Sequence, residues 1–138
     1  LFRSVSSRKD RSLILMIEIR IESKNENIMS FRINNHALIG REAILAGDAY
    51  DMVCNSVSVL SQSVVIGLDE VLKLNVNYEI RDGYLALDLN GFTQEEIEQS
   101  QVLLRTFEKS IESTILSLDE MFGSKKRREY ITLIKEEV

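Results

Sequence analysis

The chain has 138 residues, of which 44% are hydrophobic, and this is enough apolar material for one domain around one core. The formal net charge is −5, and because residues 1–12 contribute +3 (four basic and one acidic side chain), residues 13–138 carry −8. This acidic body argues against nucleic acid as the main ligand and suits a basic protein partner, although solubility alone explains it equally well.

Residues 1–12 are basic, rich in serine and without hydrophobic periodicity, which predicts a disordered leader ahead of a single domain over residues 13–138. Met16 opens the first patterned segment, and we expect the natural chain to start there. No apolar run approaches the length that spans a bilayer, so we expect a cytoplasmic protein without membrane contact.

The first regular elements are two strands. Apolar and polar residues alternate from Leu13 to Ser23, which predicts a half-buried strand, and the alternation resumes after a polar turn and continues to Asn35. The two strands form an antiparallel hairpin that would place His36, the only histidine, at the end of the second strand. A strand end is a rigid support for a catalytic group.

A loop over residues 37–48 and a helix from Ala49 to Leu72 are predicted next. Gly40 and Gly47 permit hinge motion in the loop, and its apolar residues either contact a substrate or cover the core. The helix is predicted by apolar residues that recur at steps of three and four, namely Val53, Val57, Leu60, Val64, Leu68 and Val71.

Cys54, the only cysteine, falls in the first turn of this predicted helix. With Asp51 as the N-cap, the helix start would stabilise a thiolate, and N–H groups around Val53–Asn55 would stabilise an oxyanion. Ser58 lies one turn later on the same face. A thiol and an imidazole brought together are the minimum set for a cysteine hydrolase. A lone cysteine, however, is more often a buried apolar side chain, so the residues alone leave both interpretations open.

A second hairpin is predicted over residues 73–89. Alternating segments from Lys73 to Ile80 and from Tyr84 to Leu89 flank an Asp-Gly turn, which is a strong hairpin signal. The residues of the first segment expected to face inward are Leu74, Val76, Tyr78 and Ile80.

A long helix and a short strand complete the chain. Thr93 and Glu96 have capping-box spacing, and the apolar repeat after them predicts a helix that ends at Gly123. The basic quartet Lys125–Arg128 is expected to be solvated, and the alternating run after it predicts an edge strand. The order predicts a two-layer α+β fold, β-β-α-β-β-α, with a four-stranded, largely antiparallel sheet, both helices on one face and a short C-terminal edge strand.

One stretch carries a family resemblance. His36-Ala37, then a loop, then Asp51-Met52-Val53-Cys54 with Ser58 four residues later, resembles the His-Ala and Asp-x-Val-Cys-x-x-x-Ser signature of the Prp family of bacterial ribosomal-processing cysteine proteases. The element order agrees with that family from about Met16 onward.

The resemblance implies a cysteine endopeptidase with Cys54 as nucleophile and His36 as general base and acid. It implies supporting or substrate-binding roles for Asp51, Ser58, Asn35, Ala37, Gly47 and Asn55. It also implies a basic ribosomal protein as peptide substrate, cut in the N-terminal extension of large-subunit ribosomal protein twenty-seven, and a homodimer. No cofactor, metal or direct nucleic acid contact is expected, and one cysteine with one histidine excludes a structural zinc site.

The chain departs from the family pattern at three positions. Asn35 and Ala49 stand where relatives usually carry glycine, Asn55 stands where they carry alanine, and the loop after His36 is longer. Ala49 and Asn55 keep a second hypothesis open, a catalytically idle module that binds a ribosomal protein without cutting it. A structural domain with a buried thiol is a third.

Overall fold

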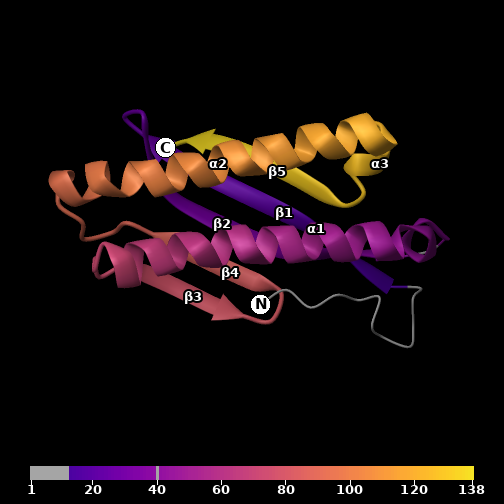
Figure 1. The fold of residues 1–138 in the computed structure, drawn as a ribbon, viewed down its shortest axis with the longest axis horizontal. Helices are drawn as coiled ribbons and strands as arrows, with labels where there is room; N and C mark the ends of the chain where they lie inside the picture. Colours follow the sequence, from indigo (N-terminus) through magenta and orange to yellow (C-terminus); the bar gives the residue numbers. More distant parts are fainter. Residues whose placement is uncertain (1–12, 40) are drawn as a thin grey trace.

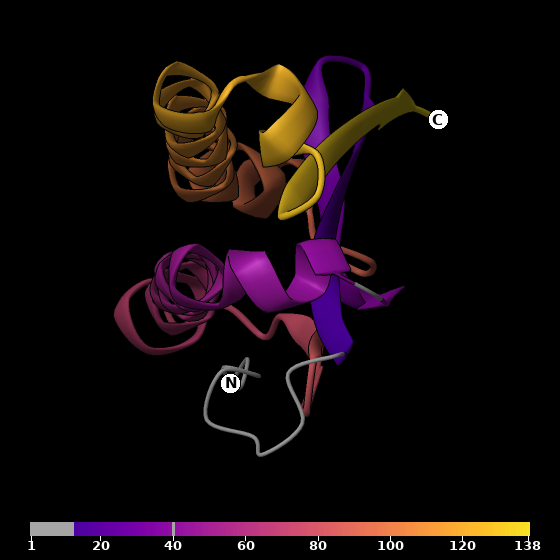
Figure 2. The same ribbon diagram turned by 90° about the vertical axis from the view of Figure 1, so that its right-hand side faces the viewer.

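The computed structural model describes the backbone of residues 13–39 and 41–138, and the side chains of residues 16–35 and 52–138. Five strands form one mixed sheet, and two long helices cover one of its faces (Figures 1 and 2). The predicted α+β class and the two-layer arrangement are confirmed, while the sheet has five strands instead of four. The predicted leader, residues 1–12, lies outside the described residues.

The first hairpin consists of β1 (Leu13–Lys24) and β2 (Asn27–Ile39). Alternate residues of both strands are buried, as their apolar pattern predicts. The turn between them holds Asn25 and Glu26 at positive φ angles of 52° and 69°. β2 continues past the predicted end at Asn35, so His36 lies inside the strand, opposite Met16, and not at its end.

The remaining strands are β3 (Asn77–Arg81), β4 (Tyr84–Asp88) and β5 (Ile131–Glu137). The order across the sheet is β3-β4-β2-β1-β5, and β5 is parallel to β1 whereas the other pairs are antiparallel. The second hairpin and the C-terminal edge strand are present as predicted, although β3 begins at Asn77, four residues later than the predicted start at Lys73. β3 and β5 are the two edges of the sheet.

The two long helices are α1 (Arg41–Ile66), which continues into a π-helical turn η2 (Gly67–Val71), and α2 (Gln94–Phe122). The predicted capping box opens α2: the hydroxyl of Thr93 accepts from the Glu96 N–H, and the Glu96 carboxylate accepts from the Thr93 N–H at 2.9 Å. A short helix, α3 (Ser124–Arg127), precedes β5 and was not expected from the sequence.

The predicted loop over residues 37–48 is wrong, because residues 37–39 belong to β2 and residues 41–48 to α1. The physical reason lies in the sequence Arg-Glu-Ala-Ile-Leu-Ala at 41–46, which contains strong helix formers and no Pro. A single glycine inside such a run, Gly47, lowers helix stability without ending the helix. α1 therefore begins eight residues earlier than Ala49.

Met52–Val71 is long and apolar enough to cross a membrane by composition, contrary to the expectation from the sequence. In this fold half of the segment is buried inside the protein. Val57, Leu68 and other apolar residues of its inner face belong to the core between α1 and the sheet, which accounts for the hydropathy of the segment as that of a core helix.

Gln101 links α2 to the β1–β2 hairpin, which contains His36. Its side-chain amide accepts from the Ile28 N–H at 2.8 Å and donates to the Ile28 carbonyl at 2.9 Å, and both bonds are buried. We expect Gln101→Ala to lower the free energy of unfolding by about 2–4 kcal/mol, because two buried backbone groups lose their partners. Urea unfolding measures this, with the exposed Gln94→Ala of the same helix changing stability by no more than about 0.5 kcal/mol. A similar small change for Gln101→Ala would contradict the role given to this side chain.

Candidate active site

Cys54 is a core residue of α1. Its exposed fraction is 0%, and it lies among the buried residues between the helix and the sheet, next to Val53 and Val57. It is about three and a half turns from the helix start at Arg41. The predicted position in the first helical turn is therefore wrong.

This placement changes the chemistry available to the thiol. Backbone N–H groups in a helix interior bond to carbonyls one turn earlier, so those of Val53–Asn55 are not the oxyanion donors that we predicted. Asp51 also lies inside α1 and is not its N-cap, and its side chain lies outside the described residues. The start of this helix is therefore too far from the sulfur to stabilise a thiolate there.

The helix residues near Cys54 divide into an inner and an outer face. Ser58 is one turn after Cys54 and is likewise buried, with 7% exposed, which confirms that the two share the inner face. Ser61 is buried on the same face, but its hydroxyl donates to the Val57 carbonyl at 2.7 Å and so serves the helix itself. Asn55 is exposed, and the structure does not bring it to the face of Cys54.

Asn35, the residue before His36, contacts the turn of the second hairpin. Its amide nitrogen lies 3.3 Å from the position that a Cβ atom on Gly83 would take, and Gly83 has a φ of +73°. Among the residues that the structure describes, the buried amide oxygen of Asn35 has no hydrogen-bond partner. Gly83 is thus needed both for the turn and for the space that Asn35 fills. The sequence signalled the turn but not its contact with Asn35.

His36 is described through its backbone. The residue lies in β2, and α1 packs directly on β1 and β2, so the strand of His36 and the helix of Cys54 are neighbours in adjacent layers (Figures 1 and 2). The side chains of His36 and Ala37 and the surroundings of Gly47 lie outside what the structure describes. Proximity of the imidazole and the sulfur therefore stays a prediction.

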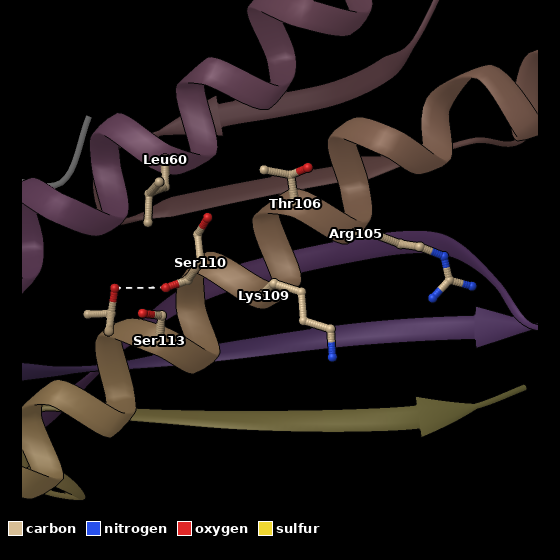
Figure 3. Close-up of a pocket in the computed structure, with 7 residues that line it drawn as sticks. Leu60, Arg105, Thr106, Lys109, Ser110 and Ser113 are labelled. Atoms are coloured by element: carbon tan, nitrogen blue, oxygen red, sulfur yellow. Dashed lines mark hydrogen bonds between the residues drawn. The ribbon is translucent and has the colours of Figure 1, made fainter.

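A groove elsewhere on the molecule lies between α1 and α2 (Figure 3). Leu60 contributes from α1, and the other lining side chains come from α2, including Arg105, Lys109 and Ser110. The Ser110 carbonyl accepts from the hydroxyl of Thr114 at 2.9 Å, so that hydroxyl is occupied within the helix. Cys54 is not among the residues that line this groove, so the groove is distinct from the candidate active site.

Comparison with known families identifies the family of the chain. A sequence model described as cysteine protease Prp matches residues 16–123, a range that contains both His36 and Cys54. The chain belongs to the cysteine protease Prp family. The Prp assignment makes it a cysteine protease and confirms the resemblance seen in the sequence. A comparison with curated protein sequences gives no significant match.

Solved structures agree with the Prp assignment. The chain is similar to SMU.848 from Streptococcus mutans, with 25% identity, a TM-score of 0.65, and coverage of 89% of this chain and 96% of the other. It shares its fold with the essential ribosomal processing protease Prp from S. aureus, solved with a covalently linked product peptide (18% identity, TM-score 0.54) and with a substrate peptide (17%, 0.57). In both comparisons 87% of this chain and 99% of the other are covered.

Proposed function

We propose that this Prp-family protease cuts the N-terminal extension of large-subunit ribosomal protein twenty-seven, with Cys54 as nucleophile and His36 as general base and acid. The observation that carries the proposal is the family match over residues 16–123. A cysteine protease requires a thiol, and Cys54 is the only cysteine in the chain, as His36 is the only histidine. The S. aureus Prp structures support peptide cleavage and ribosomal processing as the activity of that relative.

The reaction follows from these two groups. The sulfur of Cys54 attacks the scissile carbonyl carbon while His36 takes the thiol proton. The tetrahedral intermediate collapses to a thioester, and the amine leaves with the proton from His36. A water molecule then attacks the thioester and gives its proton to His36, which returns it to the sulfur as the carboxylic product departs.

Burial of the thiol adds a condition to this reaction. Because Cys54 is 0% exposed, a peptide carbonyl reaches the sulfur only after the groups that cover it have moved. Substrate binding therefore includes a rearrangement around Cys54, and we infer that the peptide induces the productive geometry.

The test is incubation of the full chain with the same organism's ribosomal protein twenty-seven, followed by mass measurement of the products. We expect one cut that shortens the N-terminus, no cut with a Cys54→Ala protein, and no cut in a ribosomal protein that lacks the extension. An intact ribosomal protein that nevertheless forms a stable complex would reject the protease and support the idle binding module.

The charge distribution supports a protein substrate and no direct nucleic acid contact. Within the basic quartet, Arg127 bonds to Asp119 at 2.8 Å and Lys126 pairs with Glu129 at 3.3 Å, so two of its four charges are neutralised locally. The acidic remainder of the chain suits a basic ribosomal protein. We place the activity in the cytoplasm, where ribosomal proteins are made.

A homodimer is also part of the proposal. Apolar side chains are exposed on both long helices, and apolar surface of this kind is often covered by a second copy. Among the described side chains of α1 and α2, the four most exposed of these are Val59, Val102, Leu116 and Met121. Light scattering of the purified chain checks this, and a mass of one chain at micromolar concentration would refute it.

A further inference from the structure

We propose that the open edge of β3 binds the peptide substrate as an additional strand of the sheet. β3 is the edge opposite β5, and all five of its residues are exposed, whereas its partner β4 has Leu85 and Leu87 buried. A sheet edge presents a row of backbone donors and acceptors that pairs readily with an extended chain. The inference rests on the proposed protease function and specifies where its substrate binds.

The register identifies which backbone groups point outward. Arg81 pairs with Tyr84 across the two-residue turn, so this pair holds the hydrogen bonds that close the hairpin. Antiparallel pairs alternate between bonded and non-bonded, which turns the N–H and carbonyl groups of Tyr78 and Ile80 to the open edge. Five residues of strand span about 17 Å, the length of a pentapeptide segment.

The side chains at the same two positions form an apolar strip. Tyr78 pairs with the buried Leu87 and Ile80 with the buried Leu85, so both lie on the helix-covered side of the sheet. They are nevertheless 47% and 43% exposed, contrary to the inward burial that their alternation predicts. The positions that offer free edge groups therefore also offer apolar contacts for an added strand.

Charged side chains on the opposite edge bond to other elements, whereas the described ion pair of β3 lies within its own hairpin. On β5, Lys135 pairs with Glu112 of α2 at 3.1 Å, and Glu136 bonds to Arg20, so charged side chains occupy that edge. On β3, the guanidinium of Arg81 bonds to Glu79 at 3.0 Å and lies 4.0 Å above the Tyr84 ring. The Arg81 side chain is therefore held against its own hairpin and does not protect the edge from pairing with an added strand.

Two observations favour a peptide over a second copy as the occupant. The turn that follows β3 contacts Asn35 through Gly83. The C-terminal end of the β3 edge therefore lies near Asn35, the residue that precedes His36. A symmetric pairing of two β3 edges about their central residue would place Glu79 opposite Glu79 of the partner copy, and like charges in that position are destabilising. An extended peptide with no acidic side chain opposite Glu79 does not meet this repulsion.

The test measures amide hydrogen exchange by NMR in the full-length Cys54→Ala protein, with and without a synthetic peptide of the ribosomal N-terminal extension. We expect bound peptide to slow exchange of the Tyr78 and Ile80 amides at least tenfold, while the Glu79 amide, already directed to β4, changes little. Bound peptide with unchanged exchange at Tyr78 and Ile80 would overturn the proposal. Protection that precedes the peptide and rises with protein concentration would assign the edge to a second copy instead.

Kinetics separate this inference from the protease assignment. In the active protein, Ile80→Ala should raise KM about fivefold with kcat nearly unchanged, because the side chain contributes to docking and not to chemistry. The matched variant Ile134→Ala, on the opposite edge strand, should leave both constants within twofold. Cleavage with an unaltered KM for Ile80→Ala would defeat only the β3 inference, whereas neither binding nor cleavage of the peptide would remove both proposals.

Discussion

Replacement of Cys54 by alanine or by serine should lower kcat for cleavage of the ribosomal extension by at least about a thousandfold, since either change removes the nucleophile. The fold should survive, at a cost of about 1–3 kcal/mol for the altered packing or the buried hydroxyl. A peptide cleavage assay with mass detection measures the activity, and urea unfolding measures the stability.

The control for this pair is Ser61→Ala. Ser61 is buried on the same face of α1, but its hydroxyl bonds to the Val57 carbonyl, so its loss should leave kcat within about twofold. Equal losses in the Ser61 and Cys54 variants would show that damage to packing, and not removal of the sulfur, explains the effect.

Replacement of His36 by alanine should lower kcat/KM by about 10²–10⁴-fold, the usual contribution of a general base. The structure makes a second prediction, because Cys54 lies well inside α1 and the helix start does not supply a positive environment for the thiolate. Alkylation of Cys54 should therefore lose its acceleration near neutral pH in His36→Ala, and its rate should rise only at higher pH.

The measurement is the rate of Cys54 modification by iodoacetamide against pH, in both proteins under the same conditions and without substrate peptide, which would occupy the site. If the rate depends on pH in the same way in His36→Ala and in the protein without this substitution, another group activates the sulfur. Loss of folding is checked by urea unfolding of the same samples.

The elements with strong local signals were predictable from the sequence. β1, β4 and α2 follow from strict alternation, the Asp-Gly turn and the Thr93–Glu96 capping box, each of which acts over a few residues. The buried face shared by Cys54 and Ser58 was predictable for the same reason, because helix periodicity sets it wherever the helix begins.

The start of α1 was not predictable from its glycines and possible cap residues. Two glycines and an Asp at a family position suggested a loop and an N-cap, but the helix propensity of residues 41–46 outweighed them. The wrong helix start also affected the predicted chemistry, because it placed Cys54 at a helix terminus whereas Cys54 lies in the helix interior.

Long-range features were also beyond the sequence. Nothing local shows that β5 joins β1 in parallel, or that Asn35 fills the space left by Gly83. Burial of Tyr78 and Ile80 was predicted from alternation, but alternation indicates only which side of a strand a residue occupies. Their exposure depends on β3 being at the sheet edge, which is a property of strand order.

The central claim is that Cys54 is the sulfur nucleophile of a peptidase. It is tested most directly by a peptide of the ribosomal extension that carries a chloromethyl ketone at the cleaved bond, followed by intact mass and fragment mapping. We expect one thioether adduct per chain, on Cys54, with chloride released, and its formation should slow when unmodified peptide competes. Persistent cleavage of the substrate by protein whose Cys54 is fully modified would contradict the account.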